Sequence, residues 1–308
     1  MVLGAHSARR TTERLGRSDV AEGHAVHGMA QRLSQLTGSP VRSCSYPTAP
    51  LDFDASIADR AVVGQPEAHG KHLLVPFPDA AVTAHLHLGM VGRVSVRRHR
   101  RALGADGFPR TNPPAAAGLR WRLLTSEHIA DISAPTICEW LDAGGVAALH
   151  ARLGPDPLRP DADPESFRRK VSRSRRAIGQ LLLDQSVIAG VGNVYRAEIL
   201  WCLRIDPRRP GNDLDTDQIE RLWNEAATLL DLGLGAGWIV TDDAQLRAAR
   251  ALLIRGERVP RWPKVYAVYG RASQPCRVCA TPVRAAPMGQ QRIFWCPTCQ
   301  PAGSSATP

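Results

Sequence analysis

The spacing of apolar residues predicts one helix followed by a series of strands in the first half of the chain. Apolar residues recur at helical intervals between residues 24 and 36, and Gly38-Ser39-Pro40 then ends the helix. Beyond this point, short apolar segments separated by Pro, Gly and Asp predict the strands of a β-sandwich. The segments are residues 41–45, 72–77, 82–88 and 119–124.

The helical period returns at about residue 141 and predicts a second, α-helical domain. A less regular, arginine-rich segment over residues 233–270 then leads to a cluster of cysteines. The whole pattern predicts an α+β multidomain fold. The expected helices cover residues 145–152, 164–172, 178–183, 193–202 and 215–232.

These changes of pattern give the expected domain boundaries. We expect the β-sandwich over residues 21–140, the helical domain over 141–262, a small cysteine-containing domain over 263–300 and a tail over 301–308. Residues 1–20 are polar and rich in arginine, with no sustained apolar period. They are interpreted as a disordered extension or a wrongly assigned start.

The balance of charges favours a polyanionic partner. The net charge is +10 and the isoelectric point is about 9.8, so phosphates can be neutralised by cationic side chains. Only three of the 39 basic residues are lysine, and each lysine is therefore examined individually. No apolar run is long enough to cross a membrane and no secretory signal is present. We expect a cytoplasmic, nucleoid-associated protein that does not bind membranes.

Four cysteines near the C-terminus have the spacing of a structural zinc site. Cys276 and Cys279 form one Cys-x-x-Cys pair, Cys296 and Cys299 form a second, and 16 residues separate the pairs. Two thiolates from each of two tight turns complete a tetrahedron around one Zn²⁺. The intervening segments 281–285 and 292–295 are expected to pair as a β-hairpin. The alternative is a set of four unligated cysteines.

A glycine-bounded turn in the helical domain is a candidate phosphate-binding site. A new helix is expected to open at Gly192-Asn193, where free backbone N–H groups and the positive end of the helix dipole can receive a phosphate. An arginine-rich segment over residues 168–176 lies upstream. The alternative is an ordinary packing joint between two helices with a solvated basic face.

Three stretches together resemble the formamidopyrimidine-DNA glycosylase/endonuclease VIII family, and most closely its actinobacterial endonuclease VIII-like branch. The resemblance covers residues 21–300 and implies a β-sandwich, a helix-two-turn-helix domain and a zinc finger, with DNA held between them. It also implies that Asn193 binds a phosphate. The stretches are Leu153-Gly154-Pro155-Asp156-Pro157-Leu158, residues 180–193 and Phe294-Trp295-Cys296-Pro297-Thr298-Cys299-Gln300.

The resemblance also implies catalytic residues, but the position of the nucleophile is altered. Glu22 matches the family's general acid/base and Lys71 its catalytic lysine. The family's N-terminal proline, whose amine attacks the deoxyribose, is replaced by Ala21 behind twenty residues. An amide nitrogen cannot form an imine, whereas a free α-amine with a pKa of about 8 suits that task. We hypothesise that translation starts at Val20, so that removal of the initiator leaves Ala21 with a free amine.

The expected DNA contacts include a second departure from the family pattern. Met90 matches a side chain that fills the gap left by a flipped base, although a core position is an equally simple interpretation. Gln291 stands where the family has a phosphate-binding arginine, and Arg292 lies one residue further on. A shift of one residue on a hairpin moves a side chain to the opposite face, so Arg292 is not assumed to replace it.

Two functions of different classes remain open from the sequence. The first is a monomeric base-excision repair glycosylase and abasic-site lyase, which removes oxidised bases, pyrimidines rather than purines, from double-stranded DNA. The second is a catalytically impaired, zinc-dependent protein of the same fold that binds damaged or abasic DNA. Glu22 and Lys71 favour the enzyme, whereas Ala21 and Gln291 favour the binding protein.

Overall fold

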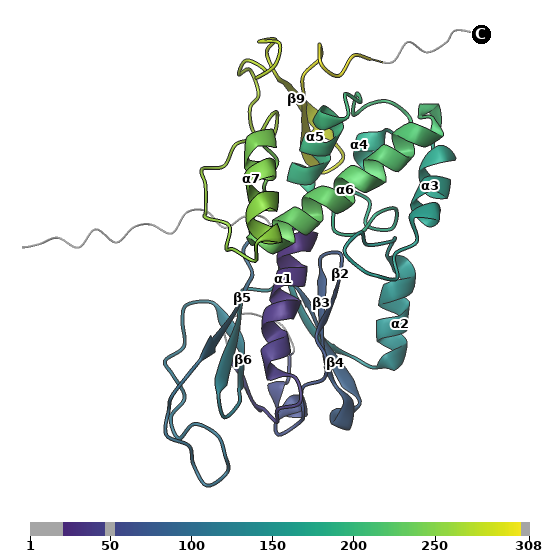
Figure 1. Cartoon of the computed structure of the whole chain (residues 1–308). Coiled ribbons are helices and arrows are strands. Elements are labelled where there is room, and N and C mark those ends of the chain that lie inside the picture. The colour runs from purple at the N-terminus through teal and green to yellow at the C-terminus, as the bar shows by residue number, and fades with distance from the viewer. Residues whose placement is uncertain (1–20, 47–52, 303–308) are drawn as a thin grey trace, which may run out of the picture.

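The computed structural model describes residues 21–46 and 53–302, and Figure 1 shows the arrangement of their elements. Strands gather in one half of the molecule and most helices in the other, which confirms the predicted α+β fold. The extension predicted for residues 1–20 lies outside the described residues, and the domain boundaries stay predictions. Within the described ranges, no helix has both the length and the apolar character needed to cross a bilayer.

The N-terminal half consists of two four-stranded antiparallel sheets. The first has the order β1-β6-β7-β5 and the second the order β2-β3-β4-β8. The predicted segments at 72–77 and 119–124 are β3 and β6, while β2, β5, β7 and β8 were not predicted. The strands of the first sheet are β1 (Arg42–Ser45), β5 (Arg93–Arg98), β6 (Leu119–Leu124) and β7 (His128–Ser133). Those of the second are β2 (Glu67–His69), β3 (His72–Phe77), β4 (Val82–His87) and β8 (Ile137–Leu141).

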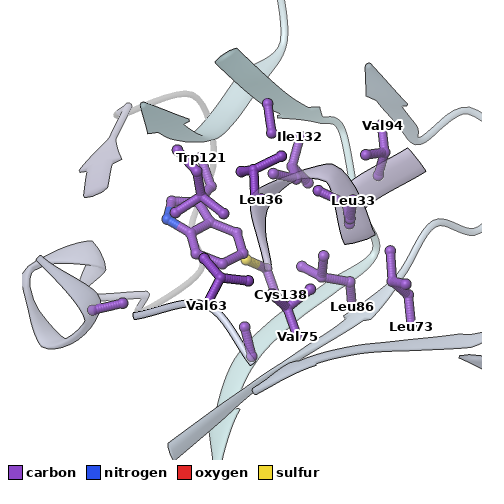
Figure 2. Packing of buried hydrophobic residues seen from close by; sticks show 14 of the residues in the cluster. Leu33, Leu36, Val63, Leu73, Val75, Leu86, Val94, Trp121, Ile132 and Cys138 are labelled. Carbon is purple, nitrogen blue, oxygen red and sulfur yellow. The ribbon is translucent and has the colours of Figure 1, made fainter. Parts of the chain in front are cut away.

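Helix α1 (Gly23–Leu33) and the short 3₁₀ helix η1 (Ser34–Leu36) fill the space between these sheets. Leu33 and Leu36 are fully buried and pack with Trp121 of β6 and Leu86 of β4, as Figure 2 shows. Apolar side chains from both sheets and from the helix therefore form a single core, and their burial is the main force that holds the half together. The other end of α1 contacts α6 (Thr216–Ala236) of the helical half.

The helical half contains the five predicted helices. The match is complete for α3 (Pro164–Ser172) and α5 (Asn193–Cys202), and both keep the apolar spacing that predicted them. The others are α2 (Ala143–Arg152), α4 (Ile178–Leu181) and α6. Short 3₁₀ helices lie at Ala55–Ala58, Pro78–Ala80 and Gly211–Asp213.

The expectation of a less regular segment over residues 233–270 is confirmed for residues 255–270, which contain no helix or strand, and is wrong for much of the part before them. Helix α6 continues to Ala236, and a further helix, α7, spans Asp243–Ile254. The N-cap of α7 is Asp242, whose side chain accepts a hydrogen bond from the backbone N–H of Gln245 at 3.1 Å. Exposed arginines on α7 weaken the helical periodicity of its apolar residues, and for this reason the sequence pattern did not predict the helix.

The C-terminal hairpin is present, with one strand shifted from its predicted place. Strand β9 spans Arg284–Met288 and pairs with β10 (Gln291–Trp295), whereas the prediction placed the first strand at residues 281–285. Gly289 and Gln290 form the turn, and β10 contacts α5.

Candidate active site

Glu22 lies at the junction of the two halves and is fully buried. Its Oε2 accepts a hydrogen bond from Gly192 N at 2.8 Å, and its Oε1 accepts one from Val194 N at 2.9 Å. A Cβ atom at position 192 would lie only 2.4 Å from Glu22 Cδ, so this close approach requires glycine. The first turn of α5 was predicted to offer free N–H groups to a phosphate. That prediction is wrong for these two groups, because a carboxylate from the other half of the molecule already occupies them.

Burial shifts the pKa values of Glu22 and Lys71 toward each other. Burial raises the pKa of the Glu22 carboxyl, although nearby Lys71 and the backbone N–H groups oppose this effect. Burial lowers the pKa of the Lys71 amine against the attraction of Glu22, and Arg196 lowers it further. Burial thus favours the protonated form of the Glu22 carboxyl and the neutral form of the Lys71 amine, as expected of a proton donor and a proton acceptor.

Lys71 stands in the turn between β2 and β3 and reaches into a groove of about 730 Å³. The preceding residue, Gly70, has a φ of +59°, and its N–H donates to Asp156 Oδ2 at 2.6 Å. A side chain at position 70 would be strained and would also meet Ala189. The groove is lined by Lys71, Arg176, Gln180, Leu183, Asp184, Met288, Gly289, Gln290 and Gln291.

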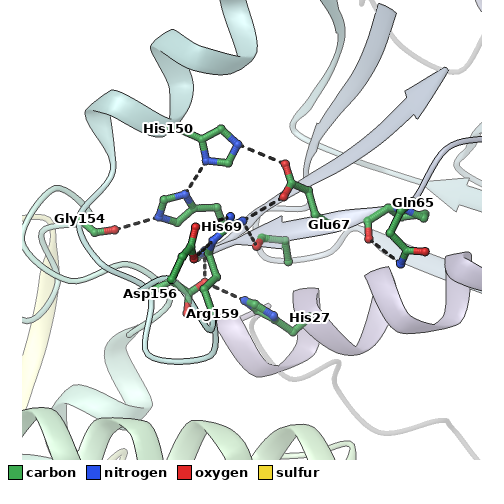
Figure 3. A network of polar contacts seen from close by, with 12 residues as sticks. His27, Gln65, Glu67, His69, His150, Gly154, Asp156 and Arg159 are labelled. Atoms are coloured by element: carbon green, nitrogen blue, oxygen red, sulfur yellow. Dashed lines mark hydrogen bonds and ion pairs between the residues drawn. The ribbon is translucent and has the colours of Figure 1, made fainter. Parts of the chain in front are cut away.

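Asp156 is a buried carboxylate that links the segments carrying both catalytic candidates. Besides Gly70 it accepts a hydrogen bond from His27 Nε2 of α1 at 2.7 Å and one from Leu158 N at 2.9 Å. Figure 3 shows His27 and Asp156 pointing toward each other from the two halves. Burial acts to raise the pKa of this carboxyl, but the hydrogen bonds from His27 and the backbone hold it below its usual value. The sequence placed Asp156 in a family motif without assigning it a role.

Arg196 joins α5 to the C-terminal hairpin from a buried position. Its guanidinium donates to Gly179 O and to Arg292 O, each at 3.0 Å, and to Asn193 Oδ1. The bond to Asn193 fixes the amide so that its N–H₂ group remains the donor. Asn193 also lies close to Glu22 at the start of α5, because the residues on either side of it donate their backbone N–H groups to that carboxylate. Sequence reasoning missed Arg196, and no local pattern distinguishes it among 36 arginines.

The two hairpin residues proposed as phosphate contacts face different grooves. Gln291 lines the groove that contains Lys71. Arg292 lines a separate groove with Arg208 and Trp295. The expectation that adjacent positions on the hairpin point to opposite faces is therefore confirmed, and Arg292 does not take the place of Gln291.

Met90 is exposed in the turn between β4 and β5. Met90 is 66% exposed and the adjacent Val91 is 62% exposed. The interpretation of Met90 as a core residue is therefore wrong. Two neighbouring apolar side chains in water have no packing role within the described chain, and this leaves Met90 available for contact with another molecule.

The four C-terminal cysteines converge as a metal site requires. Their Sγ atoms all lie within 4.8 Å of one another, with 3.4 Å between Cys279 and Cys296 and 3.8 Å between Cys276 and Cys299. A tetrahedron with Zn–S bonds of about 2.3 Å places sulfurs about 3.8 Å apart. The four thiolates therefore fit one Zn²⁺, and they lie beside the hairpin that carries Gln291.

Comparisons with known proteins agree with this geometry. The family described as formamidopyrimidine-DNA glycosylase H2TH domain matches residues 153–244. Endonuclease 8 1 of Mycobacterium tuberculosis is 40% identical over 288 residues, which cover 91% of this chain and 99% of that protein. The chain belongs to the formamidopyrimidine-DNA glycosylase/endonuclease VIII family.

Other members of the formamidopyrimidine-DNA glycosylase/endonuclease VIII family extend this comparison. The probable endonuclease 8 2 of Streptomyces coelicolor is 32% identical, covering 93% of this chain and 96% of that protein. The formamidopyrimidine-DNA glycosylase of the same organism is 30% identical, and the match covers 82% of this chain and 84% of that protein. The Lactococcus lactis enzyme, solved with abasic-site DNA, shares the fold at a TM-score of 0.70 and 19% identity, covering 91% of this chain and all of that one.

Several histidines near the junction of the two halves are hydrogen-bonded. Among the described residues, the four cysteines are the one cluster that could hold a metal ion. His69 Nε2 lies 2.9 Å from Gly154 O, and His85 Nδ1 lies 2.8 Å from Glu139 Oε1. Figure 3 shows His69 and His150 adjacent to Glu67 at the boundary between the halves. Burial, followed by the neighbouring His85, lowers the pKa of His72 to about 3, so this imidazole is neutral.

Proposed function

We propose that this protein is a base-excision repair DNA glycosylase with abasic-site lyase activity, which removes oxidised bases, pyrimidines more than purines. Its family membership makes it a DNA glycosylase. The observation that carries the proposal is the buried Glu22 carboxylate at the start of α5, with Lys71 nearby in a groove that also contains Gln291 of the hairpin. We further propose that it acts as a monomer on double-stranded DNA at the nucleoid in the cytoplasm.

The reaction proceeds through an imine and an elimination. An amine attacks C1′ of the damaged nucleotide, the bond to the base breaks, and the base leaves with a proton. Glu22 is the proton donor and acceptor, because burial raises the pKa of its carboxyl and favours the form that carries a proton. Loss of a proton from C2′ then expels the 3′ phosphate. A chain that begins at Ala21 carries the attacking α-amine directly before Glu22, in contact with the N-terminal core.

The DNA contacts of the proposal come from three elements. The Asn193 amide donates to a phosphate near the scissile nucleotide, and Met90 fills the space vacated by the flipped base. Gln291 donates to a phosphate in the Lys71 groove without adding charge. Arg292 contacts the backbone from the other face of the hairpin. One Zn²⁺ bound by the four cysteines keeps this hairpin folded and takes no part in the reaction.

The proposal is tested with duplex oligonucleotides that contain one oxidised pyrimidine, one oxidised purine or no lesion. We expect base release and strand scission on damaged duplexes only, faster for the pyrimidine, with loss of both on Glu22→Gln. The protein is assayed as a chain beginning at Ala21, and its N-terminus is verified by mass spectrometry. Binding to damaged DNA without base release or scission would instead identify a binding protein of the same fold.

A further inference from the structure

Two histidines, one from each half of the molecule, are in direct contact where the halves meet. His69 is the last residue of β2, and His150 lies in the last turn of α2. Their Nδ1 atoms are 2.8 Å apart. On the far sides of the two rings, His69 Nε2 lies 2.9 Å from Gly154 O, and His150 Nε2 lies 3.2 Å from Glu67 Oε1. Figure 3 shows these contacts as one continuous chain from the carbonyl to the carboxylate.

The three contacts need three protons on the two rings. Gly154 O accepts hydrogen bonds and cannot donate, and so does the ionised carboxylate of Glu67, which also accepts from Arg159 Nη1 at 3.1 Å. The Nε2 atoms of both histidines must therefore carry a proton. A third proton must lie between the two Nδ1 atoms, because two lone pairs at 2.8 Å repel each other. Two neutral imidazoles carry only two N–H protons, so all three contacts are satisfied only when one ring is an imidazolium.

We propose that His69 and His150 are positioning residues for the lyase reaction, and that they hold the Lys71 turn in place while His150 is an imidazolium. The inference rests on the proposed function and leaves the roles of Glu22 and Lys71 unchanged. Neither histidine takes part in a chemical step, because both act through the backbone of β2. The consequence is that scission slows when the pH rises through the titration of this pair.

The surroundings of the two rings place the charge on His150. Its Nε2–H points to a carboxylate, and a charge-assisted hydrogen bond of this kind is stronger than a neutral one. Its side chain is 27% exposed, so the charge keeps some contact with water. His69 is buried and donates to a neutral carbonyl. Burial lowers the pKa of the His69 imidazole, although the hydrogen bond to Gly154 and the nearby Asp156 oppose this effect.

The other groups around the pair are mostly acidic. Arg159 donates to Glu67 at 3.1 Å and to Asp161 at 2.8 Å, so its positive charge is shared between two carboxylates. His72 is neutral, because burial, followed by the neighbouring His85, lowers its pKa to about 3. The excess of carboxylates favours a positive charge on His150. The titratable and charged groups that face the pair are Glu67 of β2, His72 of β3, and Asp156, Arg159, Asp161 and Asp163 of the segment after α2.

The pair acts on Lys71 through the end of β2. Gly70 and Lys71 form the turn that directly follows His69. The contacts of His69 with Gly154 and His150 tie this end of β2 to the helical half. When the third proton is lost, one of the three contacts becomes a repulsion between lone pairs, and the turn is held by fewer hydrogen bonds. A loss equivalent to one hydrogen bond slows a reaction that depends on this placement on the order of 10-fold.

Nitrogen NMR of the histidines in the full chain tests the proton count. Long-range proton–nitrogen spectra distinguish an imidazolium from either neutral tautomer. His150→Phe keeps a ring without nitrogen atoms, and it therefore identifies the signals of His150. We expect His150 to be an imidazolium at about pH 6 and neutral at about pH 8.5, because imidazoles titrate near neutral pH. A His150 ring whose protonation stays the same between these pH values would overturn the inference.

Single-turnover scission of a duplex with one abasic site tests the positioning role, on the same protein preparation that tests the proposed function. His150→Arg keeps a cation with N–H donors that does not titrate in this range. We therefore expect the ratio of its rate to the wild-type rate to rise about 10-fold between about pH 6 and pH 8.5. The ratio cancels the titration of Glu22 and Lys71, which both proteins share.

Two further variants complete this test. His150→Phe should be slower than wild type on the order of 10-fold at about pH 6, with unchanged affinity for the abasic duplex, which also verifies that it is folded. The matched control His128→Phe, in β7 of the other sheet, should have the wild-type rate and pH profile.

The outcomes separate the inference from the proposed function. A ratio of His150→Arg to wild type that stays constant with pH would overturn the positioning role, even if the imidazolium is observed. Weaker DNA binding by His150→Phe with an unchanged scission rate would overturn it too. Both results would leave the proposed function intact. Absence of scission and of base release in the wild type at every pH would remove the proposed function and the positioning role together, whereas the NMR titration would still decide the proton count.

Discussion

The Asp156 carboxylate accepts hydrogen bonds from three donors, and replacing Asp156 by alanine removes all three bonds. Two of these bonds hold the segments that carry Glu22 and Lys71. His27 Nε2 belongs to α1, which begins directly after Glu22, and Gly70 N directly precedes Lys71. Asp156 itself lies in the loop between α2 and α3. We therefore expect Asp156→Ala to reduce both the free energy of unfolding and the rate of catalysis.

The magnitude follows from the burial of each donor. The Gly70 N–H is buried with Asp156, and leaving it unpaired costs about 1–3 kcal/mol. The hydrogen bonds from His27 and Leu158 to Asp156 are only partly buried. In the variant, water can accept these two hydrogen bonds in place of the carboxylate, at a cost of about 1 kcal/mol in total. The expected loss for Asp156→Ala is about 2–4 kcal/mol. Displacing the Lys71 amine by about 1 Å slows catalysis on the order of 100-fold.

Urea unfolding and single-turnover strand scission measure the two effects, with Asp161→Ala as the control. Asp161 is a neighbouring carboxylate whose side chain is 65% exposed and pairs with Arg159, so its loss is expected to cost less than about 0.5 kcal/mol. Wild-type stability in Asp156→Ala would refute the energetic argument. Lower stability with an unchanged scission rate would refute the role of Asp156 in positioning Lys71.

The free energy of unfolding of Asp156→Asn, measured against pH, tests the sign of the electrostatic contribution that the Asp156 carboxylate makes to stability. Because the pKa of Asp156 is depressed in the folded protein, its charge stabilises the fold above the unfolded pKa of about 3.9. That contribution disappears as the pH falls through the lower, folded pKa. The difference in stability between wild type and Asp156→Asn is therefore constant from pH 7 to about 5 and narrows below about 4. A difference that widened on acidification would contradict this assignment.

Three further predictions concern the DNA contacts and the metal. Chelation should remove one Zn²⁺ per chain and abolish DNA binding with most helicity retained in circular dichroism; undiminished binding by metal-free protein would contradict this. Gln291→Arg adds a charged donor to the groove, so DNA affinity should rise and the slope of log K against log salt should steepen by about 1. Met90→Ala should slow base release but change stability by less than about 0.5 kcal/mol, and a larger loss would indicate core packing.

The sequence predicted those parts of the fold that depend on local periodicity. Helix α5 and strand β6 appeared at their expected residues because strong apolar spacing and flanking glycines define them locally. Strand β5 was missed because Arg93, Arg97 and Arg98 flank its two valines and leave only a short alternating segment, and because β5 lies at the edge of its sheet. Helix α7 was missed for a similar reason, since arginines hide its apolar face.

The long-range contacts of the site could not be predicted from local patterns. Glu22 and Gly192 are 170 positions apart, and Asp156 and Gly70 are 86 apart, so neither hydrogen bond leaves a periodic signal. The resemblance to the family identified Glu22 and Lys71 as candidates, whereas the Cys-x-x-Cys spacing identified the cysteines. The use of the α5 N–H groups by Glu22 instead of by a phosphate became apparent only from the packing of the two halves.

The hydrogen bonds from the α5 N–H groups to Glu22 change how this protein can bind DNA. A phosphate near α5 cannot use the N–H groups of Gly192 and Val194, because Glu22 already accepts their hydrogen bonds. A side-chain donor can take their place, and we propose the Asn193 amide, which Arg196 orients, for this role. Because Arg196 also bonds the backbone of Arg292, the same guanidinium fixes the phosphate donor and the hairpin that carries Gln291. Glu22, the proposed proton donor, Asn193, the proposed phosphate donor, and the hairpin are thus positioned together by one helix terminus. We therefore expect a shift of α5 to disturb base release and DNA binding at once.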